Sequence, residues 1–490
     1  MKTLHVKKSV ALCLMALWPA LQAVAQAPVE LAQSVLYHNA TLLNPATEQL
    51  VQDGWLLVKE GRILQMGQQQ ANTKLPEASK TVDIKDQYLM PGLIDVHLHL
   101  TAGPHRAEMQ DGKPVISVKG HSELTRYHAI STLATGVTTA FSPAGEPEAN
   151  AEYVAQQQAG NWPGPKLKYA GFVFEPTPVL GGSVYPKDEA SWRAEIARQK
   201  QLGVHYIKLY AGLSKGEVAL GVRLAKEAGL KTLAHLDSVS WQYAADLGID
   251  MLTHALPTSA ELLTGDTKQA YLLERKNPYD SRYLYRWFDY VDYDSEPMQK
   301  LFSTLARQQT RVDLTLVANE LFYFGRDLNS LYPEQTMWVF HPENRSRWRA
   351  FFAALSYDWS KEDFVAAQRQ MPKVKQLLKR LYDAGVPLAI GTDLSASGPF
   401  YLRELLLTQQ AGLTHWQVLK LATSGGAEHL GLTDYGQLKT GYVADFIVLD
   451  ANPLQDLNAL NTVHTVVQQG KAWSVDELKA QLASLSNLKL

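Results

Sequence analysis

The sequence predicts an α/β protein, a (β/α)8 TIM barrel with a small β-sandwich domain formed by both termini. Short apolar runs alternate with helical stretches through the middle of the chain, and several of these stretches end in glycine just before the next run. The two ends are instead rich in short strands broken by turn residues. The chain has 490 residues, of which 46% are hydrophobic and 20% charged, so disordered and fibrous classes are excluded.

The first 25 residues are typical of a secretory signal peptide, which we place at 1–25. Three lysines precede an apolar run over 9–18, and small residues over 23–25 form a cleavage pattern, so we expect cleavage between Ala25 and Gln26. The apolar run is well short of the roughly 20 residues that a membrane-spanning helix needs. We therefore predict a periplasmic or secreted protein with no membrane partner after cleavage.

The composition limits the partners. The formal net charge is −2, and it becomes more negative once the N-terminal lysines are removed, which indicates neither nucleic acid nor an anionic membrane as a partner. The single cysteine, Cys13, lies in the apolar run, so the mature chain has no disulfide or thiol chemistry. We expect a small-molecule substrate, while the sequence leaves the oligomeric state open, a homo-oligomer included.

The strands predicted near the two ends share one character. They are short, rich in β-branched and aromatic residues, and bounded by Gly, Pro or Asp-Gly turns. Their ranges are 34–45, 53–67, 440–453 and 464–473. We interpret residues 26–90 and 435–490 as one composite domain built from both termini.

Between these ends, residues 91–434 contain the strand–helix repeats that a (β/α)8 barrel requires. Helical patterns such as those over 191–203 and 214–230 separate neighbouring strands. The predicted strands are 93–99, 136–142, 166–174, 204–212, 230–237, 248–256, 309–317 and 386–395. Because active sites of this fold form at the carboxyl ends of the strands, polar residues there are the candidates for function.

One stretch, around 259–373, is too long for ordinary strand–helix units. It contains two segments crowded with aromatic residues, over 279–297 and 340–359. The simplest interpretation is an inserted helical subdomain with its own small core. The functional interpretation is that part of it covers the active site and offers aromatic walls to a substrate.

Two histidines at the end of the first predicted barrel strand indicate a metal site. His97 and His99 have the same parity as Asp95, so on a strand the three side chains point to one side. Imidazole is a good ligand for zinc and similar metals. A pair of histidines on a strand is also compatible with ordinary hydrogen-bonded residues in a barrel mouth.

Four further residues favour the metal site over ordinary hydrogen-bonded histidines. His235, His254 and Asp393 each end a predicted strand, where barrel active sites form. Lys208 lies inside an apolar β run, and a lysine there is costly to bury unless its charge is changed or paired. Taken alone, Lys208 is better explained as a salt-bridged lysine or one whose amine reaches solvent.

These motifs together resemble the amidohydrolase superfamily, in particular its prolidase-like and imidazolonepropionase-related branch. The resemblance covers nearly all of the mature chain and includes the six candidate ligands in family order. Its motifs are PGLIDVHLH over 91–99, YIKLYAG over 206–212, the two separate histidine motifs, GTD over 391–393, and the tail over 422–454.

The resemblance implies a ligand set of His97, His99, Lys208, His235, His254 and Asp393 around two divalent metal ions, with zinc the expected metal. Lys208 would be carboxylated by CO2 and would bridge the ions, and His97, His99 and Asp393 would hold the more buried one. A hydroxide bridging the pair would be the nucleophile, since metal coordination lowers the pKa of water from 15.7 towards roughly 7. Asp393 would serve as general base and proton shuttle.

Other polar residues receive weaker assignments. Tyr210 shares the parity of Lys208, so its hydroxyl could bind the scissile carbonyl or a substrate carboxylate, although a plain wall residue is an equal alternative. We take His121 and His128 as non-ligands. We expect Asp95 to orient a ligand imidazole. Relatives often read GVTTVRD where this chain has GVTTAFSPAG over 136–145, which puts any substrate contact at that loop in doubt.

The sequence therefore predicts an exported binuclear amidohydrolase that hydrolyses an amide bond, of a dipeptide or an N-acyl amino acid. Cyclic amides, lactones and phosphotriesters remain open as substrates of the same site. Two rivals remain as well: an inactive binding protein on the hydrolase fold, and a mononuclear hydrolase in which Lys208 is only structural.

Overall fold

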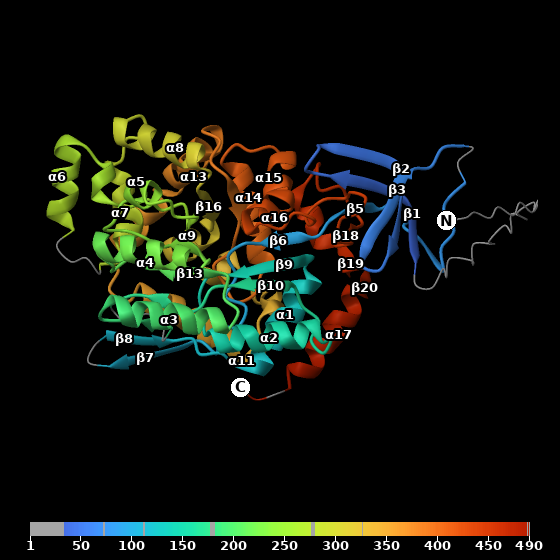
Figure 1. The fold of residues 1–490 in the computed structure, drawn as a ribbon, viewed down its shortest axis with the longest axis horizontal. Helices are drawn as coiled ribbons and strands as arrows, with labels where there is room; N and C mark the ends of the chain where they lie inside the picture. Colours follow the sequence, from blue (N-terminus) through green and yellow to red (C-terminus); the bar gives the residue numbers. More distant parts are fainter. Residues whose placement is uncertain are drawn as a thin grey trace, which may run out of the picture.

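The computed structural model describes residues 34–71, 74–110, 113–176, 182–275, 280–325, 327–487 and 489. The predicted signal peptide lies outside these residues. At the centre of the molecule is a barrel of parallel strands, flanked on one side by a separate sheet (Figure 1). The barrel strands, in chain order, are β6 (Leu93–Asp95), β9 (Val137–Ser142), β10 (Lys166–Tyr169), β13 (Tyr206–Leu209), β14 (Lys231–Ala234), β15 (Met251–Leu252), β16 (Arg311–Leu314) and β17 (Leu388–Ile390).

The ring of strands is closed by two short parallel bridges. Strands β6, β9 and β10 form one sheet, and β13 to β17 form the other together with β11 (Val173–Phe174) and β12 (Ser183–Val184). Ala170 pairs with Tyr206 at one seam, and Leu98 pairs with Leu394 at the other. Each predicted barrel strand therefore contains an observed one, and the predicted TIM barrel is confirmed.

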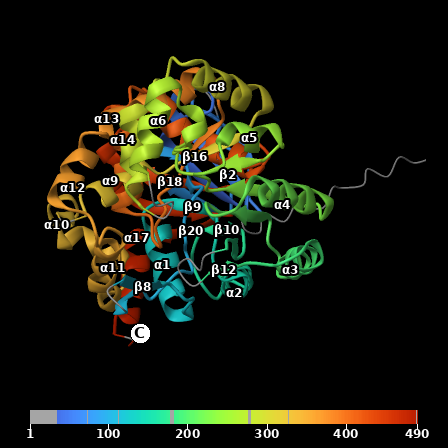
Figure 2. The same cartoon turned by 90° about the vertical axis from the view of Figure 1, so that its left-hand side faces the viewer.

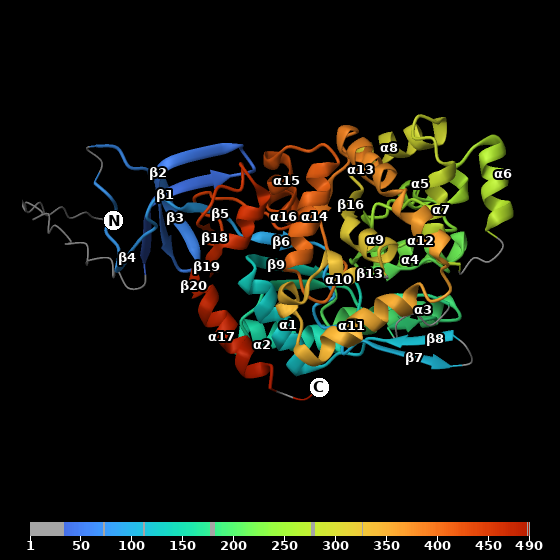
Figure 3. The same cartoon turned by 180° about the vertical axis from the view of Figure 1, so that it is seen from behind.

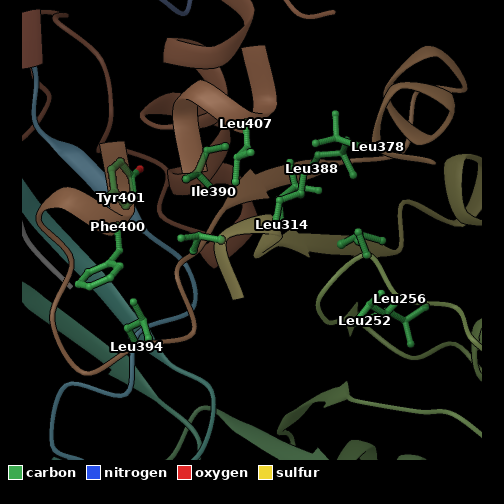
Figure 4. Packing of buried hydrophobic residues seen from close by; sticks show 14 of the residues in the cluster. Leu252, Leu256, Leu314, Leu378, Leu388, Ile390, Leu394, Phe400, Tyr401 and Leu407 are labelled. Carbon is green, nitrogen blue, oxygen red and sulfur yellow. The ribbon is translucent and has the colours of Figure 1, made fainter. Parts of the chain in front are cut away.

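Apolar side chains fill the barrel and fix the helices around it. Val96, Phe141 and Leu233 belong to a buried cluster that packs together inside the ring. On the outside, Ile390 and Leu314 lie close to Leu407 and other leucines of the covering helices (Figure 4). Figure 2 shows the helices arranged around the strands. They include α1 (Ser122–Ala134), α2 (Pro147–Gln158), α3 (Glu189–Gln201), α4 (Lys215–Glu227), α5 (Trp241–Asp246), α13 (Met371–Asp383), α14 (Pro399–Gln410), α15 (His415–Leu421) and α16 (Ser424–Leu430).

The flanking sheet is built from both ends of the chain, as predicted. Its strand order is β20-β19-β18-β5-β1-β2-β3, with β4 paired to β1. The strands are β1 (Val35–Asn44), β2 (Gln49–Lys59), β3 (Arg62–Gln68), β4 (Lys80–Asp83), β5 (Tyr88–Pro91), β18 (Phe446–Leu449), β19 (Val463–Gln468) and β20 (Lys471–Ser474). The last helix, α17 (Val475–Leu485), leaves this sheet and packs against α1.

Strand β5 leads directly into β6 through Gly92, so the flanking sheet meets the barrel where β6 begins. A Cβ at Gly92 would lie 2.3 Å from the Thr138 hydroxyl oxygen, so only glycine allows this close approach. The carboxyl end of β6, which carries the predicted histidines, therefore points away from the sheet.

The long stretch around 259–373 surrounds a barrel strand. Its first part is α6 (Gly265–Glu274), α7 (Tyr283–Tyr290) and α8 (Glu296–Gln308), and β16 follows. Its second part is α9 (Leu316–Tyr323), α10 (Leu328–Leu331), α11 (Pro342–Leu355) and α12 (Lys361–Gln368). Trp287, Phe288 and Trp348 belong to the same buried cluster as the barrel-covering helices. The expectation of a separate small core is therefore wrong, because these aromatic side chains extend the main core.

The second part of this stretch also contacts the loop that follows β6. In that loop, β7 (Arg106–Gln110) and β8 (Lys113–Ser117) form a hairpin that packs along α11 (Figure 3). The His105 backbone N–H donates to Asn344 Oδ1 over 3.1 Å, and the His105 ring lies 4.9 Å from the Phe351 ring. None of the described helices is both long and apolar enough to span a membrane.

The flanking sheet offers a test of its core. Leu56 on β2 is fully buried, whereas Leu64 on β3 is 46% exposed. We expect Leu56→Ala to lower the free energy of unfolding by about 2–5 kcal/mol, because it removes buried methyl groups and leaves a cavity. Leu64→Ala, the same substitution at an exposed site, should change it by less than about 0.5 kcal/mol. Denaturant unfolding followed by circular dichroism measures both, and equal effects would contradict the assigned core.

Candidate metal centre

Side chains from five barrel strands come together at the carboxyl ends of those strands. His97 and His99 follow β6, Lys208 lies in β13, His235 follows β14, His254 follows β15, and Asp393 follows β17. These are the six residues that the sequence predicts as ligands. The contacts described below connect them into one group.

The tightest part of this group contains two imidazoles and one carboxylate. Asp393 Oδ1 lies 3.2 Å from His97 Nε2 and 3.0 Å from His99 Nε2. Ligand atoms bound to one zinc ion at about 2.0–2.2 Å lie roughly 3.3 Å apart when the geometry is tetrahedral. The carboxylate oxygen therefore lies at nearly this spacing from each imidazole nitrogen, and the three donor atoms all lie within 4.8 Å of one another.

Both imidazoles are held so that Nε2 faces Asp393. His97 Nδ1 donates to Asp313 Oδ2 over 3.1 Å, and His99 Nδ1 donates to the Ala144 carbonyl oxygen over 3.1 Å. An imidazole that donates from one nitrogen presents the lone pair of the other to a metal. Ala144 belongs to the loop in which this chain departs from GVTTVRD, so this loop positions His99 through its backbone.

Asp313 on β16 is a site residue that the sequence analysis missed. It is fully buried, and besides the His97 imidazole it accepts the backbone N–H of His254 over 2.9 Å. One carboxylate thus connects two predicted ligands on different strands. The available signal was an aspartate between Val312 and Leu314 at the end of an apolar strand, where a charge is costly unless it is paired.

Asp95 was expected to orient a ligand imidazole, and this prediction is wrong because its carboxylate binds other groups. Asp95 accepts hydrogen bonds from the His97 backbone N–H at 3.1 Å and from the Thr392 and Ser397 hydroxyls at 2.8 Å each. It therefore holds the backbone at the two ends of the barrel seam. The imidazole that it was expected to orient is oriented by Asp313.

His235 and His254 form the outer part of the group. The His254 ring lies 4.7 Å from the His97 ring and 4.6 Å from the His235 ring. His235 Nε2 is hydrogen-bonded to the Tyr283 hydroxyl over 3.3 Å, and its Nδ1 is buried without a hydrogen-bond partner among the described residues. A buried imidazole nitrogen of this kind is costly unless another group, such as a metal ion, binds it.

The backbone is strained at two of the predicted ligands. His254 has φ = 74° and Asp393 has φ = 60°, a region that costs a residue with a side chain about 1–3 kcal/mol. Asp313 holds the His254 backbone, and the Asp393 N–H donates to the His97 carbonyl oxygen over 2.7 Å. Such strain persists where the surrounding structure fixes a side chain for function.

Lys208 reaches the group from β13. It is 2% exposed, and its Nζ donates to Thr253 Oγ1 over 3.3 Å, next to His254. In the part of the chain that the structure describes, no carboxylate forms an ion pair with it. Burial lowers its pKa to about 8, although Asp313 and Asp393 act in the opposite direction. The neutral fraction of this amine near physiological pH is therefore larger than that of an exposed lysine.

Charges at the centre favour a cation beside His97. Burial lowers the pKa of the His97 imidazole, but the charges of Asp313 and Asp393 outweigh burial and raise that pKa to about 9. Burial and the charge of Lys208 lower the pKa of His235 to about 3, so that imidazole is neutral. Burial raises the pKa of Asp393, but the charges of His97 and His254 outweigh burial and hold that pKa well below its usual value. The Asp393 carboxylate and the His235 imidazole are therefore both in the protonation states that bind metal.

The remaining sequence candidates are also placed. The Tyr210 ring lies 4.8 Å from the His235 ring, at the edge of the group, and burial raises the pKa of its hydroxyl. His121 caps α1 by accepting the Leu124 backbone N–H. His128 is buried on α1 with its ring 5.8 Å from that of Phe340.

Comparisons with known proteins indicate the family and the fold. The model of the amidohydrolase family matches residues 326–473, which include Asp393 and the tail motif. Imidazolonepropionase from Cupriavidus taiwanensis is 25% identical over 469 residues, covering 90% of this chain and 95% of that protein. The resemblance of the chain to the amidohydrolase superfamily is therefore shown by a family model and by a relative that spans most of its length. The prediction made from its motifs is confirmed.

Other members of the superfamily match in sequence or in structure. Ochratoxinase from Aspergillus niger is 28% identical over 151 residues, which span 29% of this chain and 31% of that protein. Its crystal structure aligns with a TM-score of 0.64 at 18% identity, covering 90% of this chain and 96% of that one. Bottromycin amidohydrolase aligns with a TM-score of 0.67 at 18% identity, covering 92% and 90%. These structures share the amidohydrolase barrel.

Substitution of Asp313 tests the candidate metal centre directly. In Asp313→Asn one oxygen cannot accept from both the His97 ring and the His254 backbone, so we expect zinc binding to weaken about 10–100-fold. Competition with a chromophoric chelator measures this affinity. The matched control is Asp250→Asn, because Asp250 accepts the Thr232 backbone N–H on a barrel strand without contacting a predicted ligand. Unchanged zinc affinity in Asp313→Asn would show that Asp313 does not orient His97.

Proposed function

We propose that this chain is an exported, binuclear metal-dependent amidohydrolase that hydrolyses the amide bond of a dipeptide or an N-acyl amino acid. The observation that supports this most strongly is the gathering of two imidazole nitrogens within 3.2 Å of one carboxylate oxygen. Three more donor residues border them. An inactive relative has no need to keep such a set complete.

The residues fit two divalent ions, for which zinc is the expected metal. His97, His99 and Asp393 would hold the more buried ion, and His235 and His254 the outer one. Bound zinc would supply Lewis acidity, which lowers the pKa of water and polarises a carbonyl group. The unpartnered His235 Nδ1 and the carboxylates on either side of His97 support this assignment.

Lys208 would join the two ions after reaction with CO2. A neutral amine adds to CO2 and loses one proton, which gives a carbamate whose single negative charge is shared by two oxygens. The lowered pKa of Lys208 supports this step, because only the neutral amine reacts. The change also replaces a buried cation by an anion among metal ions, which removes the cost of burying an unpaired ammonium group.

Two residues would move or hold protons and substrate. Asp393 Oδ2 lies 3.8 Å from His254 Nδ1, so this carboxylate faces both parts of the group. It can accept a proton from attacking water and deliver it to the departing amine nitrogen. The Tyr210 hydroxyl, beside His235, would bind the scissile carbonyl or a substrate carboxylate.

The substrate class is proposed from relatives. Solved structures that share this fold include a Xaa-Pro dipeptidase with bound methionine in the active site, with a TM-score of 0.63 at 17% identity. Other relatives are an imidazolonepropionase, an ochratoxinase and a 5-methylthioadenosine/S-adenosylhomocysteine deaminase. Export rests on the N-terminal 25 residues alone.

A substrate screen tests the bond class. Purified protein supplied with zinc and bicarbonate should hydrolyse members of a dipeptide or N-acyl amino acid library. Asp393→Asn should reduce kcat by at least about 10²–10⁴-fold, because it removes a general base. Turnover of lactones or phosphotriesters with no turnover of any amide would contradict the amide assignment.

Metal analysis tests the role of Lys208. We expect about two zinc ions per chain in the wild type and at most one in Lys208→Ala, measured by plasma mass spectrometry after removal of free metal. The control is Lys168→Ala, because Lys168 also lies on a barrel strand but donates to the Leu430 carbonyl oxygen. A single ion in the wild type, with unchanged binding in Lys208→Ala, would instead support a mononuclear enzyme.

A further inference from the structure

We infer that Tyr283 on α7 is a positioning residue for His235 and makes metal binding depend on that helix. The inference rests on the proposed function, since it assigns His235 to a metal. It concerns a residue outside the motifs that predict the site. Tyr283 begins α7, between barrel strands β15 and β16.

The His235 ring has one nitrogen occupied and one available. Its Nε2 is hydrogen-bonded to the Tyr283 hydroxyl over 3.3 Å, whereas the buried Nδ1 has no partner within the described part of the chain. Once Nδ1 binds a metal, Nε2 carries the proton and donates to the Tyr283 oxygen. This hydrogen bond fixes both the tautomer and the rotation of the ring.

Tyr283 is itself held in place by the strand that carries His235. The Arg275 guanidinium lies over the Tyr283 ring at 5.0 Å, and its Nη1 donates to Asp237 Oδ1 over 2.8 Å. A second hydrogen bond joins Arg275 Nη2 to Asp237 Oδ2. Asp237 follows His235 by two positions. The contacts from Asp237 to Arg275, from Arg275 to Tyr283 and from Tyr283 to His235 therefore tie α7 to the loop that carries the imidazole.

Helix α7 is also hydrogen-bonded to the loop after β15. The Trp287 indole N–H on α7 donates to the Ser259 carbonyl oxygen over 3.1 Å, and the Thr258 hydroxyl donates to Asp237 Oδ1 over 2.9 Å. Trp287 is fully buried. The Tyr283 hydroxyl is therefore fixed relative to the barrel by packing and hydrogen bonds on both sides, which is what a residue that orients a ligand requires.

The experiment removes only the hydroxyl. Tyr283→Phe keeps the ring beneath Arg275 and deletes the hydrogen bond to His235. We expect one of the two zinc ions to bind about 10–100-fold more weakly and the other to bind as in the wild type, measured by chelator competition on metal-free protein. The absorption spectrum of the cobalt-substituted protein should change as well, because the orientation of one ligand changes.

The matched control is Tyr285→Phe on the same helix. The Tyr285 hydroxyl is hydrogen-bonded to Asp363 and contacts no predicted ligand, so zinc affinity and the cobalt spectrum should stay as in the wild type. Equal zinc affinities in Tyr283→Phe and wild type, or equal losses in the two variants, would overturn the inference. A wild type that binds no more than one zinc ion would instead contradict the proposed function, so the two failures are distinguishable.

Discussion

The arrangement of the site depends on one electrostatic constraint, two carboxylates held on opposite sides of one buried imidazole. Asp313 and Asp393 both lie within hydrogen-bond distance of the His97 ring, one at each nitrogen. Two negative charges on either side of one buried imidazole favour a cation between or beside them. In the metal-free chain a proton on His97 meets that need, which is why its pKa rises to about 9 in spite of burial. We propose that metal ions meet it in the active protein.

The barrel converts distant sequence positions into neighbours of this imidazole. Closure between β6 and β17, through the bridge from Leu98 to Leu394, brings the first and last barrel strands side by side. Gly391 allows this seam to be tight, because a Cβ there would lie 2.5 Å from the Cβ of His97. Asp95 ties the same seam together below the site through Thr392 and Ser397. The positive φ angle of Asp393 is stable only within such a framework.

The parts of the chain outside the barrel contact opposite ends of it. The flanking sheet, built from both termini, adjoins the start of β6 and is distant from the site (Figure 1). The helices inserted around β16 lie on the other side and reach the site directly, through Tyr283 to His235 and through Asn344 to the loop after β6. The aromatic residues of these helices extend the main core, so the segment is held firmly enough to position a side chain.

The sequence by itself determined the alternation of strands and helices, the pairing of the two termini and the six residues that meet at the barrel mouth. Periodicity and motif order are local properties, and each candidate ligand lies at the end of an apolar run. Only the tertiary structure decided that Asp313, not Asp95, orients His97, and that Tyr283 contacts His235. These contacts join different strands or an inserted helix, and their partners are set by strand register and side-chain direction, which no local pattern encodes. The sequence did not predict the core that the barrel and the insertion share. Packing between segments distant in sequence is set only in the folded chain.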